Sequence, residues 1–311
     1  MILLRSIRQP RLRAFSTNVD PAAYCEDFVR KHDYDSFLIG KFWSGPLQQP
    51  YFAIKAFSTE LAMIQDSVSN ATIGAMRIQF WRDAVRDIFA ASSLNPGSFP
   101  PRHPIALALH QATKAADLPA YYFKRIVDAR DTELRSGTYQ SSEGLVAHAE
   151  SVASSVLYLL LALRGLGGSD TFAHAASHLG TAQTIATLVR GLPHHAANRQ
   201  LPLPLDISAR HGVKQEEVFR HGGDASGIDG AVYDVAVLAN DHLLTARDMF
   251  KEELGGKVPA LAMPVFLAGV PVTSFLERLE KCNFDAFNKS LALRDWRVSW
   301  RIYRAAYHRT F

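Results

Sequence analysis

Two aspartates four residues apart, Asp83 and Asp87, form the Asp-x-x-x-Asp pattern of this chain. Carboxylates at that spacing share one helix face and could hold a divalent cation between them. On the same stretch Trp81, Val85 and Ile88 form an apolar stripe, which turns both aspartates outward. Metal sites in helical bundles are built from inward-facing side chains. We therefore expect a solvated charged face here rather than a metal site.

Two histidines, His174 and His178 in the stretch HAASH, are also four residues apart and could present both imidazoles on one helix face. The glutamate of a His-Glu-x-x-His metalloprotease motif is missing, so no general base accompanies them. A zinc ion would need His194 or His195 as a third ligand. Core or surface histidines are the favoured interpretation.

The stretch 180–206 predicts a helix, a polar turn and an extended segment, in that order. Ile185 and Leu188 have helical spacing, and Pro193 then interrupts the backbone hydrogen bonds. After the turn, the segment 201–205 alternates leucine with proline, which biases the preceding residue towards extended geometry. The helix is therefore expected to end near residue 191.

The stretch 51–66, YFAIKAFSTELAMIQD, predicts a second helix that carries two acids, Glu60 and Asp66. These acids are six residues apart, which corresponds to roughly 240° of rotation around a helix. They cannot bind one metal ion from that helix as a pair.

Both stretches resemble the metal-binding segments of the squalene/phytoene synthase family. In that family a Tyr-Ala-Phe helix leads to Asp-Asp-x-x-Asp, and a Gln-rich helix leads to Arg-Asp-x-x-x-Asp followed by Leu-Pro. Ala56-Phe57 match the first segment, and Arg190 and Leu203-Pro204 match the second. The resemblance implies an all-α isoprenoid-synthase helical bundle. It also implies a vestigial substrate pocket that contains Ser36, Phe37, Gln183 and Arg190.

Most carboxylates of these motifs are missing. Ala62 and Met63 stand where the first two aspartates belong, and Gly191 and His195 stand at the aspartate positions of the second segment. In the family these aspartates hold magnesium ions against a diphosphate, and neither glycine nor imidazole replaces a hard oxygen ligand. We therefore expect no catalytic residues, no metal ion and no cofactor. The degenerate metal-motif positions are Ala62, Met63, Asp66, Gly191, His194 and His195.

Further positions resemble one branch of the family more specifically. The residues that carry this likeness are 31–66, 67–69, 73–74, 76–81 and 174–178. This branch consists of pseudoenzymes that act as assembly factors for mitochondrial complex I, the NADH:ubiquinone oxidoreductase. The resemblance implies a role at an early stage of membrane-arm assembly, in the mitochondrial matrix and peripheral to the inner membrane. The partners implied are complex I membrane-arm subunits or other assembly factors.

Two other functions stay open on the residues alone. An active prenyl-diphosphate transferase would use Asp66, His194, His195 and Arg190 in unfamiliar roles, and Arg190 could pair with a phosphate through two hydrogen bonds. Several magnesium ions facing two diphosphates, however, need several carboxylates. A prenyl-lipid carrier needs only an apolar cavity, and the sequence does not separate a carrier from a scaffold.

The rest of the chain predicts helix after helix, with no strand-like alternation of any length. Because no internal repeat or Gly/Ser linker divides residues 20–311, we expect them to form a single α-helical domain. The predicted helices span 21–31, 35–42, 51–69, 73–89, 105–116, 120–135, 142–163, 170–191, 214–221, 230–250 and 259–280.

Residues 1–15 are rich in arginine, amphipathic and free of acids, which indicates a mitochondrial transit peptide. The alternative is a basic N-terminal segment that is not a targeting signal. Four arginines in this segment account for the formal net charge of +4, so the remaining body is close to neutral. No nucleic-acid binding is expected, because that body holds no basic, aromatic-interleaved recognition motif.

The cysteines and the apolar runs indicate neither a metal or disulfide site nor a membrane-spanning helix. Cys25 and Cys282 have no spacing typical of a metal site or a disulfide framework. The longest apolar runs, 156–163 and 258–272, are ended by Arg164 or broken by prolines. Neither run reaches the ~20 residues of a spanning helix, so we expect a soluble or peripheral protein.

The C-terminal segment 290–311 combines arginines with an aromatic stripe. Trp296, Trp300, Tyr303 and Tyr307 follow one another at spacings of four, three and four residues. One interpretation is a last core helix with exposed arginines. The other is an interfacial helix, because tryptophan and tyrosine favour the headgroup boundary and arginine gains about 1 kcal/mol near an anionic surface. The expected membrane contacts are Arg294, Trp296, Arg297, Trp300, Arg301 and Arg304.

Overall fold

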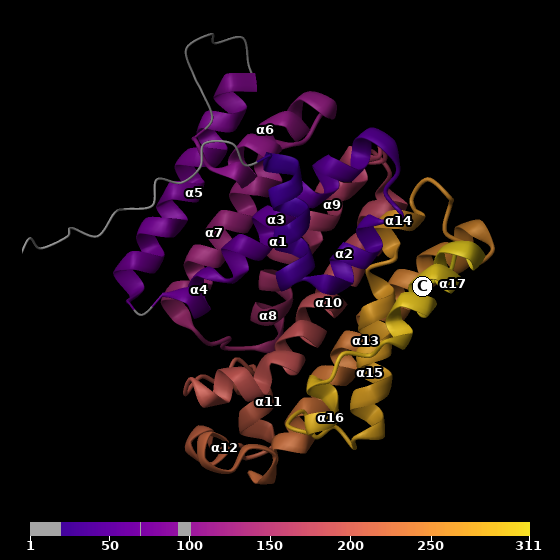
Figure 1. The fold of residues 1–311 in the computed structure, drawn as a ribbon. Coiled ribbons are helices and arrows are strands. Elements are labelled where there is room, and N and C mark those ends of the chain that lie inside the picture. The colour runs from indigo at the N-terminus through magenta and orange to yellow at the C-terminus, as the bar shows by residue number, and fades with distance from the viewer. Residues whose placement is uncertain (1–19, 69, 93–100) are drawn as a thin grey trace, which may run out of the picture.

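The structure, a computed structural model, describes residues 20–68, 70–92 and 101–311 (Figure 1). The predicted transit peptide, residues 1–15, lies outside the described residues. Every regular element of the described part is helical, so the predicted all-α fold class is confirmed.

The α-helices are α1 (Pro21–His32), α2 (Tyr34–Gly40), α3 (Gln48–Ala62), α4 (Ile64–Ser67), α5 (Ala71–Ser92), α6 (Pro104–Ala115), α7 (Ala120–Ser136), α8 (Ser142–Ala149), α9 (Ser155–Leu163), α10 (Asp170–Ala197), α11 (Leu205–Arg210), α12 (Gln215–His221), α13 (Ile228–Leu254), α14 (Met263–Phe266), α15 (Gly269–Lys281), α16 (Lys289–Ala292) and α17 (Arg297–His308). Three short segments complete them: the 3₁₀ turns η1 (Gly45–Leu47) and η3 (Gly222–Asp224), and the π-helical turn η2 (Glu150–Ser154).

Short polar side chains start several of these helices. The Asp20 carboxylate accepts from the backbone N–H of Ala22 at 3.2 Å, with a proline at the first position of α1. The Asp33 carboxylate accepts from the backbone N–H of Ser36 at 3.1 Å. Such caps satisfy donors that a helix leaves unpaired at its first turn. They explain why α1 and α2 begin where the sequence predicts, to within one residue.

Pro193 lies inside α10, so the predicted end of that helix near Gly191 is wrong. Proline removes one backbone donor from the helix. Leu192 and Ala196 are nevertheless buried on one face, and their packing outweighs the lost hydrogen bond. The turn comes after residue 197, and residues 201–204 are irregular chain, as the prolines predict.

Two further stretches that were each predicted as one helix form two helices in the structure. The stretch 259–280 forms α14 and α15, because Pro264 and Pro271 each lie in the first turn of a helix, where no N–H is needed. The stretch 51–69 forms α3 and α4. The C-terminal segment forms α16 and α17, and the Asp295 carboxylate accepts from the first backbone N–H of α17 at 3.0 Å.

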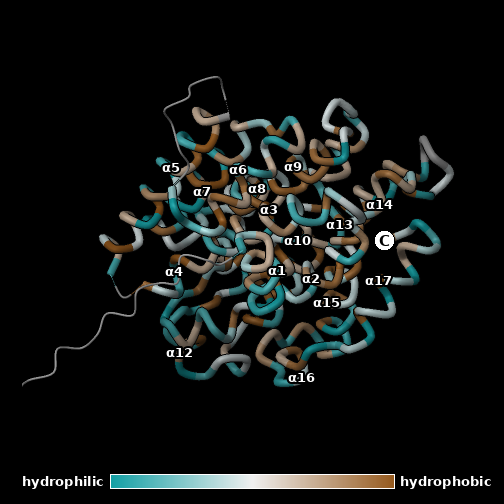
Figure 2. Tube along the Cα trace, turned by 45° about the horizontal axis from the view of Figure 1, so that its top comes forward, coloured by the Kyte–Doolittle hydropathy of each residue, from teal (hydrophilic) through white to brown (hydrophobic). Residues whose placement is uncertain are grey.

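Helix α10 is the element against which the others pack. It contacts α13 along much of its length, and also η2, α9 and α15 (Figure 1). The apolar parts of the chain face the inside of the bundle, and the polar parts face outward (Figure 2). The large residues of α10 that are buried in this core are Leu179, Ile185, Leu188, Val189 and Leu192.

The helix 142–163 approaches α10 most closely at its π-helical turn. Gly180 of α10 faces Ser154 of η2, whose hydroxyl donates to the Ser177 carbonyl at 2.9 Å. A Cβ atom at position 180 would lie 2.4 Å from the Ser154 Oγ and 2.5 Å from its backbone nitrogen. Glycine is therefore required at this crossing, because any side chain would push the two helices apart.

The same helix, Ser142–Leu163, is the one helix of the described residues whose length and composition would allow it to cross a membrane. Of its most apolar window, 56% is buried inside the fold. Within α9 almost every residue is buried, including Leu159 and Leu161. In this fold the helix packs as a core element.

Replacing Gly180 by alanine is expected to lower the free energy of unfolding by about 2 kcal/mol, because the new methyl group overlaps the Ser154 backbone. Urea denaturation followed by circular dichroism measures this change.

Gly144→Ala in α8 is the matched control. Its added Cβ meets only the Ser141 Oγ, at 3.8 Å, so helix propensity should stabilise that variant by up to about 1 kcal/mol. Equal stabilities of the two variants would contradict the close approach of η2 and α10.

Candidate functional site

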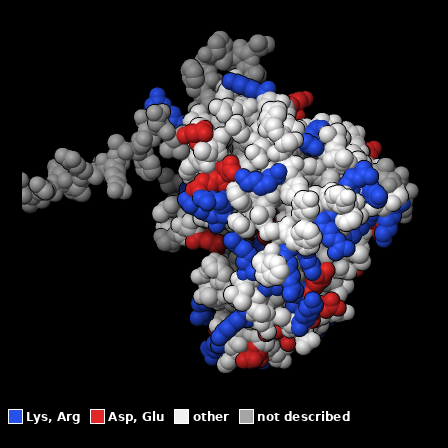
Figure 3. Space-filling view, turned by 45° about the vertical axis from the view of Figure 1, so that its right-hand side comes forward, with Lys and Arg blue, Asp and Glu red and all other residues white. Residues whose placement is uncertain are grey.

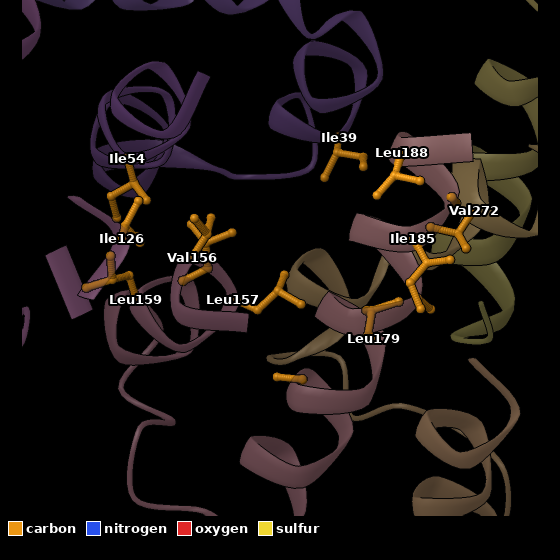
Figure 4. Packing of buried hydrophobic residues seen from close by; sticks show 14 of the residues in the cluster. Ile39, Ile54, Ile126, Val156, Leu157, Leu159, Leu179, Ile185, Leu188 and Val272 are labelled. Carbon is orange, nitrogen blue, oxygen red and sulfur yellow. The ribbon is translucent and has the colours of Figure 1, made fainter. Parts of the chain in front are cut away.

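A cavity of about 620 Å³ lies between α2, α3, α7, α9, α10 and α15, and the segment 291–298 borders it. Part of its wall is apolar. Ile39, Val156, Leu188 and Val272 supply this part from four different helices (Figure 4). Polar and charged side chains line the rest of the wall. The cavity is therefore amphipathic, with room for a ligand that has an apolar and a polar part.

The structure brings the two degenerate motif segments together at this cavity. Ala62, Met63, Asp66 and His195 line it. The Nε2 atom of His194 lies 3.5 Å from the Asp66 carboxylate and thus links α10 to α4. Gly191 lies one turn before His195 in α10, and a Cβ atom there would lie 3.1 Å from the His195 Nε2. The His195 ring thus lies beside Gly191, at the position where the family has an aspartate side chain.

These residues do not fit the magnesium ions that the family motifs imply. Ala62 and Met63 offer no oxygen ligand. Asp66 is 46% exposed and faces an imidazole rather than a second carboxylate. In residues 20–68, 70–92 and 101–311, no three His, Cys, Asp or Glu side chains are grouped so that they could hold a metal ion. Burial lowers the pKa of His195, which favours the neutral ring, and a neutral imidazole nitrogen does not replace an anionic oxygen ligand.

The four residues predicted for a vestigial pocket do not all lie at the cavity. Ser36, Gln183 and Arg190 line the cavity. Phe37 does not line it, because its ring packs against Phe52 and lies under the Lys41 ammonium group at 4.5 Å. Three of the four predicted residues therefore border one cavity, and the ring of Phe37 packs outside its lining.

Arg190, the predicted phosphate partner, is paired within the protein. Its guanidinium lies 3.5 Å from the Asp35 carboxylate. Burial raises the pKa of Asp35, and the attraction of Arg190 opposes this rise. The Arg190 side chain is still half exposed at the cavity mouth. It is engaged by Asp35, yet a strong anion could compete for it.

A second ion pair, which the sequence reading missed, lies deeper in the wall. Lys55 Nζ is 3.3 Å from the Asp33 carboxylate, and only 11% of the lysine side chain is exposed. Burial would raise the pKa of Asp33, but Lys55 and the Ser36 N–H outweigh it, and the pKa is lowered. A lone lysine within the apolar run YFAIKAF was a signal for such a pair, because buried lysines need partners.

A third charged group, also missed, joins α7 to α8. Arg130 donates to the Glu133 carboxylate at 2.6 Å, and Tyr139 donates to the same carboxylate at 3.4 Å. His148 Nε2 lies 3.6 Å away. Burial would raise the pKa of Glu133, but Arg130 and His148 lower it on balance; burial also lowers the pKa of His148. The residue spacing gave no signal for this contact, because it joins two separate helices.

The predicted charged face and the histidine pair lie away from the cavity. Asp83 and Asp87 are partly exposed and pair with Arg86 at 2.8 and 3.1 Å, as expected for a charged outer face rather than a metal site. His178 does not meet His194 or His195. Its Nδ1 lies 2.8 Å from the Nδ1 of His242 on α13, a partner that the sequence did not reveal.

Comparison with known proteins gives three findings. A model of the squalene/phytoene synthase family matches residues 29–304. The chain is 37% identical to the rat protein named NADH dehydrogenase (ubiquinone) complex I, assembly factor 6, over 98% of this chain and 90% of that protein. The human protein of the same name is 37% identical over 93% of this chain and 82% of its own length.

Among solved structures, the fold is similar to that of squalene synthase HpnC from Alicyclobacillus acidocaldarius. The TM-score is 0.71, with 86% of this chain and 95% of that chain covered. The two sequences are 17% identical, so this likeness concerns the fold alone.

Replacing Lys55 by methionine is expected to destabilise the protein by about 2 kcal/mol at pH 7, because the change leaves the Asp33 carboxylate partly buried without a cation. The lowered pKa of Asp33 means that the wild-type pair contributes stability above the ordinary pKa of 3.8 and loses it at lower pH. The difference between variant and wild type should therefore persist from pH 7 to about 4 and shrink as the pH falls further, from 4 towards 2. Urea denaturation across this pH range measures it.

Lys31→Met is the matched control, because Lys31 pairs with Asp27 on the surface, where both side chains are exposed. Exposed pairs contribute roughly 0–1 kcal/mol, so this variant should remain close to wild type at every pH. A Lys55→Met penalty that did not change with pH would contradict the assignment of the pair.

Proposed function

The chain belongs to the squalene/phytoene synthase family, and from this premise we propose that it assists the assembly of mitochondrial complex I rather than joining prenyl diphosphates. The family predicted from the sequence is thereby confirmed. Relatives at 37% identity that carry the name complex I assembly factor 6 match nearly the whole chain. The chain also covers most of the length of those relatives, so the likeness is not confined to one shared segment.

One observation supports a non-enzymatic role. The two motif segments lie together at the cavity, but other residues occupy four of their aspartate positions. Ala62, Met63, Gly191 and His195 stand at the four aspartate positions, and the remaining Asp66 faces His194. Diphosphate ionisation in such a site depends on magnesium ions held by several anionic oxygens. One half-exposed carboxylate beside an imidazole is a poor replacement for that set.

The finer parts of the proposal concern place and partners. We propose that the protein acts in the matrix, peripheral to the inner membrane, after removal of residues 1–15. It would act at an early stage of membrane-arm assembly, with membrane-arm subunits or other assembly factors as its partners. Support comes from the names of the relatives and from the Arg-rich, acid-free terminus.

A second candidate is favoured by the cavity itself. A volume of about 620 Å³ with a partly apolar wall is within the range of small-molecule sites. Loss of the metal ligands removes the means to ionise a diphosphate but leaves this apolar wall in place. The protein could therefore carry a prenyl lipid during assembly without transforming it.

The test of the proposed function uses cells that lack the protein. Restoring the wild-type chain should restore mature complex I on native gels and clear the early membrane-arm intermediates. Arg190→Gln should restore it equally well at equal protein level, because in a scaffold this change removes only the structural pair with Asp35. In a transferase the same change would remove the predicted phosphate partner.

Gly180→Ala is the control for this experiment, since it disturbs the packing of η2 on α10 rather than the cavity charges. It should restore assembly poorly, in proportion to its lower level in the cells. Normal complex I in cells without the protein would refute the assembly role. Loss of assembly with Arg190→Gln at wild-type protein level would instead favour a diphosphate-dependent activity.

A further inference from the structure

Helix α17 has two distinct faces. Val298, Ile302 and Ala305 are buried and hold the helix against the bundle, where it contacts α15 and α2. On the other side, four large aromatic side chains point into solvent. Their exposed fractions are 76% for Trp296, 63% for Trp300, 55% for Tyr303 and 76% for Tyr307. The prediction of an aromatic stripe is therefore correct, but the stripe lies outside the core.

The aromatic residues and the arginines occupy separate strips of this helix. At roughly 100° per residue, the four aromatic residues fall within about 60° of one another, opposite the buried face. Arg297, Arg301 and Arg304 share one flank between the two faces. Trp300 stacks on Tyr303 with ring centroids 5.6 Å apart, so these two rings form one apolar surface in the middle of the stripe. Figure 3 shows Lys and Arg gathered over this side of the molecule.

The positive charge of this surface is largely uncompensated. From residue 289 to 311 the sequence holds six Lys or Arg residues and one acid, Asp295. That acid accepts from Ser274 Oγ at 2.9 Å and caps α17. Arg301 pairs with Glu277 at 2.6 Å. Within the described residues, Arg297 and Arg304 form no ion pair, and both are exposed.

We propose that α17 attaches the protein to a membrane with anionic headgroups. Tryptophan and tyrosine are the residues that favour the headgroup boundary, and a flanking row of arginines matches lipid phosphates. The combination of an unpartnered aromatic stripe with an uncompensated basic flank on one helix favours this occupant over a protein surface. The proposal rests on the proposed peripheral location and names the surface that would produce it.

This attachment surface borders the cavity. Leu293, Arg294 and Val298 line the cavity, and the Arg294 guanidinium lies 3.8 Å from the centroid of the Tyr34 ring. Leu293 is 70% exposed and extends the apolar surface of α17 towards the cavity. Docking of α17 in the headgroup layer would therefore hold one side of the cavity next to the membrane.

Tryptophan fluorescence of the full chain tests this proposal directly. The sequence has four tryptophans, of which Trp43 and Trp81 are 1% exposed and Trp296 and Trp300 are the exposed pair. A water-soluble quencher therefore reaches α17 selectively. Vesicles that contain cardiolipin should shift the emission to the blue and protect it from the quencher at low salt. Vesicles of phosphatidylcholine alone should do so much less, and high salt should reverse the effect.

Matched variants assign the binding to α17. Arg297→Gln with Arg304→Gln should weaken vesicle binding about 30-fold, at about 1 kcal/mol for each arginine. Lys114→Gln with Lys124→Gln removes the same charge from exposed residues of α6 and α7 and should change binding less than about twofold. Trp300→Ala with Tyr303→Ala should weaken binding more than about tenfold, whereas Tyr121→Ala with Tyr233→Ala should not.

Three outcomes would overturn the proposal. The first is full quenching of Trp296 and Trp300 in protein that floats with the vesicles, since another segment would then be the attachment. The second is equal binding by the arginine and lysine variants. The third is unchanged vesicle binding by Trp300→Ala with Tyr303→Ala combined with lost complex I assembly, which would make the surface a protein-docking site. None of these outcomes decides the assembly role, which is tested separately by restoring the protein in cells that lack it.

Discussion

The close crossing of α10 and the π-helical turn η2 is the contact on which the site depends. Gly180 and Ser154 meet at a distance that leaves no room for a side chain. Across the same contact, Ser177 of α10 donates to the Glu150 carboxylate at 2.6 Å. Because α10 also carries Arg190 and His195, this crossing fixes where the second motif segment meets the first. π-Helical turns are frequent at functional sites, and η2 supplies Val152 and Ala153 to the lining of the cavity.

Around that crossing, the charges of the cavity are balanced by the protein itself. Asp33 pairs with Lys55, Asp35 with Arg190 and Glu133 with Arg130, and all three pairs line one cavity. A magnesium site needs carboxylates whose negative charge is left for the cation. In this chain the lost aspartates leave fewer acids, and the remaining ones have partners within the fold. The family fold can therefore persist without a metal ion to offset its acids.

The sequence predicted the helices well, because their apolar spacing and caps are local signals. It also placed Ala62, Met63, Asp66 and His195 at one site, through the family resemblance. It failed where distant contacts decide the outcome. The burial of Ala196 carries α10 through Pro193, and the Glu133–His148 and His178–His242 contacts join helices that no spacing rule connects. Lys55 was predictable in principle, since a lysine in an apolar run requires a buried partner.

Calorimetric titration tests our proposal that the cavity has lost magnesium-dependent diphosphate chemistry. The purified chain would be titrated with a prenyl diphosphate in the presence and absence of magnesium. We expect that magnesium does not strengthen binding, because Asp66 with His194 cannot hold the ion between protein and diphosphate. Binding that became tenfold tighter or more with magnesium, and that was lost on replacing Asp66 by asparagine, would contradict it.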